Sequence, residues 1–363
     1  MTRPARTNPH HPARPKQGKV IGQAAPRGRQ AHADADAVRH ATRLIYAVCC
    51  LAGAADLLDE IRVEMDAEGI SDAIRRHDTA PLFDWLIAAF SYQGISDRVA
   101  TEYMARHGRI RWHAIDAEVR ENPSCPKLKN YWEFYDCKFD KISRTCAEPD
   151  HFEGCPLPRH MLRNGRLNRT AYSLYFFIRD IAQGDLVGWI DSQLRRPDEG
   201  TDDNRLVRIG LRVIDPLRYI YGVSDKVLTM TLSCILLAAP SGYEVWREVG
   251  GSMIAVDTLV HNFLHRAGIL RRFGAEHCYG AACYRDGQCA EILARVARQI
   301  DASAFNPAFP AIFPRFVQHA VWRFCAQNGL GVCNGNRIDD RKPCGNVYCQ
   351  VQPICDRIAL DDL

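Results

Sequence analysis

The sequence contains no long hydrophobic run, few alternating strand-like patterns and little net charge. Its main apolar runs, Leu44 to Ala55 and Val227 to Ala239, are too short to span a bilayer. The first of them also begins too late to be a signal peptide, so we expect an intracellular protein with no membrane partner. Because 47% of the 363 residues are hydrophobic and 25% are charged, the composition excludes a disordered chain, a collagen-like chain and a coiled-coil rod.

Acidic residues are absent before Asp34, although the net charge of the whole chain is only +4. Seven arginines and lysines lie in that stretch, among proline, glutamine and histidine and almost no apolar residues. We therefore predict a flexible basic arm at residues 1–36, which is either a solvated tail or a tether to DNA. Any other surface that binds a polyanion must be local, because the rest of the chain carries no excess of basic residues.

The spacing of the apolar residues predicts a mostly α-helical fold. Residues 37–64 have the intervals of amphipathic helices, and the apolar segment 81–91 begins with a proline, which favours the first turn of a helix. Residues 96–107 and 170–182 are predicted to be helical as well. Residues 241–252 are interpreted as a polar insert between two such segments.

Fifteen cysteines are a high number for this length, and they indicate either a secreted disulfide scaffold or an intracellular metal protein. The odd number and the length of the chain favour metal. Eleven of them fall into three groups: Cys125, Cys137, Cys146 and Cys155; Cys278, Cys283 and Cys289; and Cys333, Cys344, Cys349 and Cys355.

Each cysteine group has its own set of alternatives. The C-terminal four suit a tetrahedral zinc ion or a [4Fe–4S] cluster, with disulfides as a third option. The first group lies in an insertion at residues 120–160, where zinc or buried thiols are both consistent with the aromatic surroundings. The middle group, with His277 beside it, would also suit zinc. For His261 and His265, one helical turn apart, we expect a packed or DNA-facing helix surface rather than a metal pair.

A helical hairpin is predicted around Gly222, where a tight turn precedes Ser224, a candidate N-cap for the apolar helix that follows. Backbone N–H groups at the start of such a helix can bind phosphate without reading a base. Lys226 lies in the first turn of that helix, where the helix dipole disfavours a cation. It is therefore either a solvated lysine or a nucleophilic amine.

A single carboxylate, Asp257, lies within the apolar segment 253–260 just before another predicted helix. It can be an N-cap, which is a common use of aspartate. It can also hold charge in a site that excludes water.

The order of these features resembles that of the iron–sulfur, endonuclease III-like branch of the helix-hairpin-helix (HhH-GPD) DNA glycosylase superfamily. The resemblance extends over residues 80–356 and rests on segments 83–93, 222–226 and 254–258 and on the C-terminal cysteines. It implies a mostly α, two-lobed helical fold for residues 37–363. The cysteine-rich insertion and a four-cysteine cluster loop at residues 333–356 would be part of that domain.

The resemblance also implies roles for single residues. Lys226 matches the nucleophilic lysine of the bifunctional members, and Asp257 matches the aspartate that those enzymes share. Gln93 matches the glutamine that fills the gap left by an extruded base. Gly222 matches the first hairpin glycine, whereas Ser224 stands where the family has a second glycine.

The C-terminal cysteines match the ligands of a [4Fe–4S] cluster, which would act as a staple. The loop that they hold would present Arg337, Arg341 and Lys342 to DNA phosphates. Zinc is the additional ion that the other two cysteine groups would take.

The resemblance implies a monomeric, bifunctional DNA N-glycosylase and AP lyase that acts on a damaged or modified base flipped out of double-stranded DNA. It would be cytoplasmic and nucleoid-associated, in a prokaryote or a phage-infected cell. Two other functions stay open. One is a base-hypermodifying enzyme on the same scaffold, similar to thymine pyrophosphorylases, and the other is a catalytically inactive DNA-binding relative.

Overall fold

The computed structural model describes residues 27–93, 95, 97–121, 124–140, 142–160, 162–163, 165–198, 200, 203–335 and 337–360. Most of the predicted basic arm, residues 1–26, lies outside this part of the chain. Helix α1 begins at Arg27, so residues 27–36, which we expected in the arm, are helical.

The described residues form sixteen α-helices and no β-strand, which confirms the predicted mostly α-helical class. In chain order the helices are α1 (Arg27–Ala52), α2 (Leu57–Ala67), α3 (Ile70–Arg76), α4 (Thr79–Phe90), α5 (Asp97–His107), α6 (Trp112–Arg120), α7 (Tyr131–Tyr135), α8 (Asn168–Phe176), α9 (Leu186–Leu194), α10 (Arg205–Leu217), α11 (Asp225–Leu237), α12 (Glu244–Ser252), α13 (Thr258–Arg266), α14 (Ile269–Arg272), α15 (Cys289–Ala297) and α16 (Pro314–Cys325). Each segment predicted to be helical from its apolar spacing overlaps one or more of these helices.

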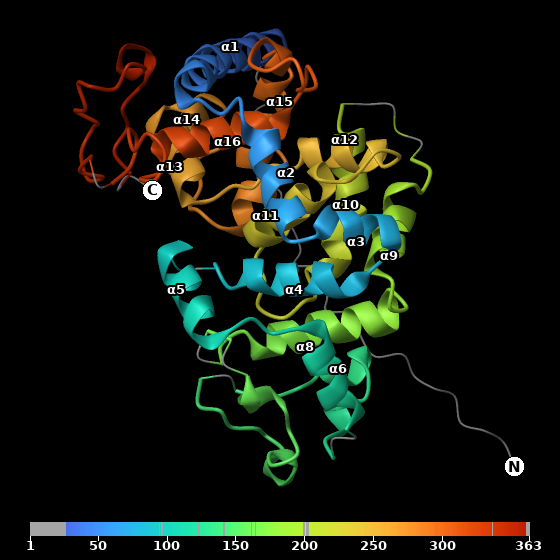
Figure 1. The fold of residues 1–363 in the computed structure, drawn as a ribbon. Helices are drawn as coiled ribbons and strands as arrows, with labels where there is room; N and C mark the ends of the chain where they lie inside the picture. The colour runs from blue at the N-terminus through green and yellow to red at the C-terminus, as the bar shows by residue number, and fades with distance from the viewer. Residues whose placement is uncertain are drawn as a thin grey trace, which may run out of the picture.

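The helices lie in two groups (Figure 1). In the upper group α1 contacts α14, α15 and α16, and α13 contacts α16. In the lower group α4 contacts α6, α8 and α9. Between them, α11 contacts α2, α4 and α12. One contiguous core of buried apolar side chains extends through both groups, so the helices that bear the candidate site are held from both sides.

The segment interpreted as a polar insert forms helix α12 and packs closely on α11, which corrects that interpretation. Trp246 and Val249 of α12 are fully buried. At Gly250 a Cβ atom would meet the Cβ of Leu236 at 2.8 Å, so only glycine permits this approach of the two helices. The apolar residues of the segment recur at helical spacing among charged ones, and this places them in the core.

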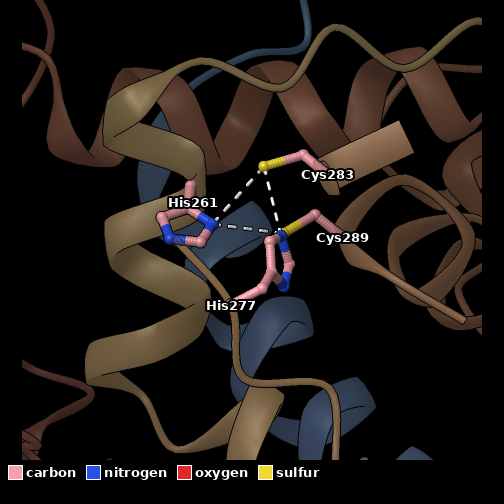
Figure 2. Close-up of side chains that lie close together, drawn as sticks. All are labelled: His261, His277, Cys283 and Cys289. Atoms are coloured by element: carbon pink, nitrogen blue, oxygen red, sulfur yellow. Dashed lines mark hydrogen bonds between the residues drawn. The ribbon is translucent and has the colours of Figure 1, made fainter. Parts of the chain in front are cut away.

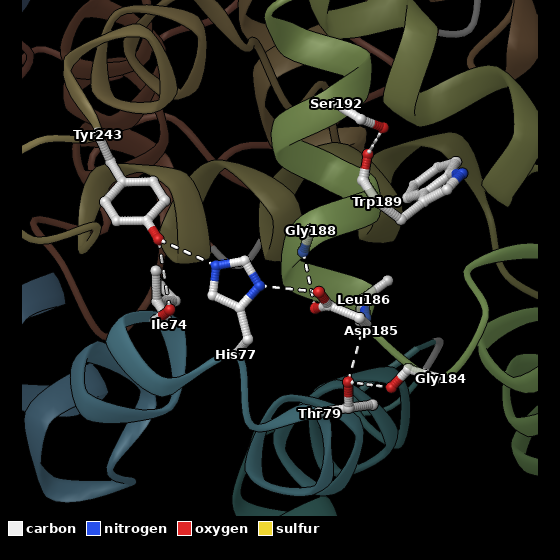
Figure 3. Close-up of polar contacts among 10 residues, drawn as sticks. All are labelled: Ile74, His77, Thr79, Gly184, Asp185, Leu186, Gly188, Trp189, Ser192 and Tyr243. Carbon is white, nitrogen blue, oxygen red and sulfur yellow. Dashed lines mark hydrogen bonds and ion pairs between the residues drawn. The ribbon is translucent and has the colours of Figure 1, made fainter.

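A group of polar contacts joins α3, α4 and α9 (Figure 3). The buried hydroxyl of Thr79 donates to the carbonyl of Gly184 at 2.8 Å and accepts from the N–H of Leu186 at 3.1 Å. Beside it, Nδ1 of His77 lies 2.8 Å from a carboxylate oxygen of Asp185, whose other oxygen accepts from the N–H of Gly188. These bonds fix the start of α9 against the start of α4.

None of the helices in the described ranges combines the length and the apolar character that a membrane span requires.

We expect Thr79→Val to lower the free energy of unfolding by about 1–3 kcal/mol, because valine keeps the shape of threonine but leaves the buried N–H of Leu186 and the carbonyl of Gly184 without their partner. Urea denaturation measures the change. Ser192→Ala is the control, since the Ser192 hydroxyl is exposed and donates to the carbonyl of Trp189 within its own helix. The free energy of unfolding of Ser192→Ala should fall by less than about 0.5 kcal/mol. Equal losses in the two variants would contradict the role of Thr79.

Candidate active site and metal centres

A cleft of about 620 Å³ lies between the two groups of helices. Helices α2, α4, α5, α11 and α16 contribute its lining, which includes the aromatic side chains of Trp85, Tyr92 and Trp322. A concave site of this size is typical of a small-ligand site, and charged and polar side chains line this one together with the aromatic ones. Lys226 and Asp257 both line it, so the structure brings together the two residues that we predicted as catalytic.

Lys226 is the second residue of α11 and is half-buried. Its Nζ lies 3.6 Å from the sulfur of Met230, one turn further along the helix and also in the cleft. The helix begins at Ser224, whose backbone is extended as an N-cap requires, although its hydroxyl makes no capping bond. The predicted start of the helix is therefore confirmed, and it directs the lysine into the cleft.

Asp257 is the N-cap of α13, and its carboxylate accepts a hydrogen bond from the N–H of Val260 at 2.9 Å. The residues before it, 253–256, are buried. Burial raises the pKa of Asp257 above its ordinary value, while the N–H of Val260 and the charge of Lys226 act in the opposite direction. Asp257 is thus both a helix cap and a carboxylate that feels the charge of Lys226 across the cleft.

Gln93 is bound to the predicted hairpin turn between α10 and α11. Its Nε2 donates to the carbonyl of Gly222 at 2.6 Å, and its Oε1 accepts from the N–H of Ser224 at 3.0 Å. Gly222 has a φ of 76°, a conformation that glycine adopts without strain. Three residues that we predicted to contact DNA therefore lie together, next in sequence to Tyr92 and close in sequence to Lys226, which line the cleft.

The polar lining of the cleft from α2 and α16 was not predicted from the sequence. Burial raises the pKa of Glu64. Burial and the charges of Arg315 and Arg323 lower the pKa of His319 to about 3, so its imidazole is neutral. Arg315 donates to the side chain of Gln318. The sequence signal that could have revealed this lining is the presence of polar residues within the otherwise apolar face of α16.

The four cysteines of the insertion are brought together, as predicted. Cys125, Cys137, Cys146 and Cys155 line one small cavity with Glu148 and His151. The donor atoms of Cys125, Glu148 and His151 lie within 4.8 Å of one another. His160, the next histidine in the sequence, does not line this cavity and contacts Glu118 and Tyr172.

The four C-terminal cysteines also line one small cavity. Cys333, Cys344, Cys349 and Cys355 surround it together with Phe263 and Arg266 of α13. The sulfur of Cys355 lies 3.7 Å from the carbonyl oxygen of Arg266. All fifteen cysteines are within the described part of the chain and each is a free thiol, so disulfides are not the reason for this grouping.

The middle group differs from its prediction. The donor atoms of His261, His277, Cys283 and Cys289 lie within 4.8 Å of one another, and this group could bind a metal ion (Figure 2). Cys278, which we predicted in the group, is exposed and lies outside it. His261 takes its place. His261 and His265 are both buried, as predicted for a packed helix surface, and His265 is not part of the group. Sequence spacing could not show that α13 runs beside the 277–289 segment.

The basic residues of the C-terminal loop are exposed, as predicted. Arg341 and Lys342 pair with Asp339 at 3.0 and 3.6 Å, and Arg337 is exposed on the same loop. The guanidinium of Arg341 holds the pKa of Asp339 at about 2. Asp339 therefore offsets one of the three positive charges that we expected to face phosphates.

Comparisons of the chain with models of protein families, with curated proteins and with solved structures find no match.

We expect Asp257→Asn to stabilise the protein at neutral pH but not in acid. Asparagine keeps the capping oxygen and carries no charge to desolvate. Because the pKa of Asp257 is raised in the folded state, the wild type loses stability as the pH rises above the ordinary aspartate value of about 3.9. The gain in the free energy of unfolding should begin near that pH, grow with pH and level off once the folded carboxyl is ionised.

Urea denaturation at a series of pH values, from about 4 to 8, tests this dependence. Asp78→Asn is the matched control, because Asp78 caps α4 through the N–H of Ala80 and lies outside the lining described for the cleft. A gain for Asp257→Asn that does not change with pH would show that burial of its charge is not the cause.

Proposed function

We propose that the protein is a bifunctional DNA N-glycosylase and AP lyase that acts on a damaged or modified base extruded from double-stranded DNA. The observation that carries this proposal is the shared position of Lys226 and Asp257 in one cleft, with their charges interacting. A half-buried amine and a carboxylate in a small-ligand site are the groups that covalent catalysis at a sugar carbon requires.

The amine of Lys226 supplies the nucleophile. Its lone pair would form a bond to C1′ of the sugar while the glycosidic bond breaks and that electron pair leaves with the base. The nitrogen then gives up a proton, for which Asp257 is the acceptor in the cleft. The C1′–O4′ bond then breaks as the nitrogen lone pair forms the Schiff base, and O4′ takes up the proton that Asp257 holds. Loss of a proton from C2′ expels the 3′-phosphate and cuts the strand.

The environment of Asp257 supports its role as proton acceptor. Burial brings its pKa closer to neutral pH, and a general base works best when its pKa lies near the working pH. The same carboxylate can stabilise positive charge that develops on the sugar as the base departs.

The position of Gln93 supports its role in base extrusion. An enzyme that acts on a base in a duplex must first rotate the nucleotide out of the stack, and a side chain then fills the gap. Gln93 is bound to the turn that leads into the helix of the nucleophile. Its insertion into DNA would release the N–H of Ser224, which could then bind a phosphate at the start of α11.

The lining of the cleft supports binding of a flat, polar ligand. Trp85, Tyr92 and Trp322 provide aromatic surfaces, and base–aromatic stacking contributes about 1–3 kcal/mol per base. The neutral imidazole of His319 and the amide of Gln318 can donate and accept hydrogen bonds at the edge of a base.

The C-terminal thiols support a [4Fe–4S] cluster over a single zinc ion. The four thiols share a cavity. They are not among the groups of the described residues whose donor atoms all lie within 4.8 Å of one another. Cluster ligands stand further apart than the ligands of one ion, because each thiolate binds a different iron. Cys333, Cys344, Cys349 and Cys355 would hold the cluster, and it would tie the loop to the end of α13.

The volume of the cleft favours a second candidate, a transferase that modifies a bulky base on the same scaffold. A cleft of about 620 Å³ lies in the range of sites for drug-sized ligands and exceeds what one planar base fills. The products distinguish the two. A lyase releases free base and a cut strand, whereas a transferase leaves an intact strand of altered mass.

We expect borohydride to trap a covalent complex between the wild-type protein and duplex DNA that carries a damaged or modified base. Lys226→Ala should abolish the complex, because the Schiff base requires that amine. Gel electrophoresis across a panel of oxidised, deaminated and hypermodified bases provides the measurement. Lys138→Ala is the control, since Lys138 is an exposed lysine of the insertion and should leave trapping unchanged. If Lys226→Ala traps as well as the wild type, Lys226 is not the nucleophile.

We expect Asp257→Asn to slow single-turnover strand cleavage by about 10²- to 10⁴-fold, the usual contribution of a general base. Affinity for the same duplex should change little, because the side chain keeps its size. The control is Asp78→Asn, which should cleave at the wild-type rate. Unfolding would not explain a lower cleavage rate, because we expect Asp257→Asn to be more stable than the wild type at neutral pH.

A further inference from the structure

The group formed by His261, His277, Cys283 and Cys289 has four nitrogen and sulfur donors that converge on one point (Figure 2). Three of the four side chains are buried and His277 is partly exposed. They come from α13, from the 274–280 loop, from a short 3₁₀ turn at Ala281–Tyr284 and from the first residue of α15. The group is outside the catalytic cleft, and neither proposed catalytic residue belongs to it.

The distances within the group are those of a tetrahedral site. Nδ1 of His261 lies 3.4 Å from the sulfur of Cys289 and 3.5 Å from that of Cys283. Nε2 of His277 lies 3.3 Å from the sulfur of Cys283 and 3.5 Å from that of Cys289. Zinc bond lengths and a tetrahedral angle place nitrogen and sulfur ligands roughly 3.6 Å apart. All four nitrogen–sulfur distances are within a few tenths of an ångström of that value.

The surroundings also select the donor atoms. Nδ1 of His277 lies 2.7 Å from the carbonyl oxygen of Ala275, which leaves Nε2 directed at the two sulfurs. A backbone carbonyl bonded to the second ring nitrogen is the usual partner of a metal-binding histidine. Cys289 is the first residue of α15, so that end of the helix lies at the group.

We propose that these four residues form a closed zinc site that joins the 274–289 segment to α13. Two thiolates and two imidazoles are a common zinc set, and four protein donors leave no position for water or substrate. The ion therefore has a structural role. This inference does not depend on the proposed function.

The site would restrain the residue next to the catalytic carboxylate. Tyr284 follows Cys283 directly, and its hydroxyl accepts from the N–H of Val256 at 2.9 Å and donates to the carbonyl of the same residue at 3.3 Å. Val256 immediately precedes Asp257. An ion bound by Cys283 would thus hold Tyr284 in place and, through it, the start of α13.

The test compares the metal content of purified full-length protein with that of single variants, measured by elemental analysis after expression in zinc-supplemented medium. We expect Cys283→Ser to contain one zinc ion fewer per chain than the wild type. Cys278→Ser is the matched control, because Cys278 is exposed in the same segment and should leave the zinc content unchanged. Equal zinc content in all three proteins would overturn the proposal, as would an equal loss in both variants.

Cobalt substitution provides a second measurement for the case in which Cys283→Ser does not fold. Cobalt in a tetrahedral thiolate site gives ligand-field and sulfur-to-metal charge-transfer absorption. Cys289→His keeps four donors but removes one thiolate, so we expect it to bind cobalt with a weaker charge-transfer band than Cys278→Ser. Identical spectra for Cys289→His and Cys278→Ser would show that Cys289 is not a ligand and would contradict the site.

Discussion

The hydrogen bond from the N–H of Val260 to the carboxylate of Asp257 is the contact on which the candidate active site depends. It starts α13, and it fixes the direction in which the carboxylate enters the cleft. An aspartate in that position lowers the free energy of unfolding, because burial disfavours its charged form. The helix must therefore be held by other contacts, since a nine-residue helix has few of its own.

Those contacts lie along α13 at regular intervals. His261, one turn after the cap, belongs to the proposed zinc site, and Arg266 at the other end contacts the cysteine loop. The carbonyl of Arg266 accepts from the N–H of Ile358 at 2.9 Å, and its buried guanidinium pairs with Asp340. Two of the three cysteine groups thus act on the same short helix. Polar contacts from both groups therefore hold this helix in addition to its apolar packing.

The helices could be predicted from the sequence because apolar spacing reports directly on the face that a helix buries. Lys226 and Asp257 could be singled out because each lies at the start of an expected helix and matches a position of the family that the sequence resembles. The metal group could be predicted only in part, because its fourth donor, His261, comes from a helix distant in sequence, and spacing carries no information on such distances. Cys278 was included for the same reason, since its exposure is decided by the path of the loop. The helix at residues 244–252 was missed because charged residues surround its few core positions.

The position of the proposed zinc site is explained by two opposing effects at Asp257: the helix cap holds its carboxylate in the cleft, and burial there disfavours its charge. An ionised carboxylate gains hydration if it rotates out of the cleft, and the first turn of a helix is the part that opens most readily. Rotation is opposed if the residue before the cap and the residue one turn after it are both anchored. Val256 is bound by Tyr284, and His261 contacts the sulfurs of Cys283 and Cys289, so both anchors lie in the segment that the metal would hold. A metal ion bound at this place would keep the carboxylate in the cleft that Lys226 also lines, without adding a further charge to that cleft.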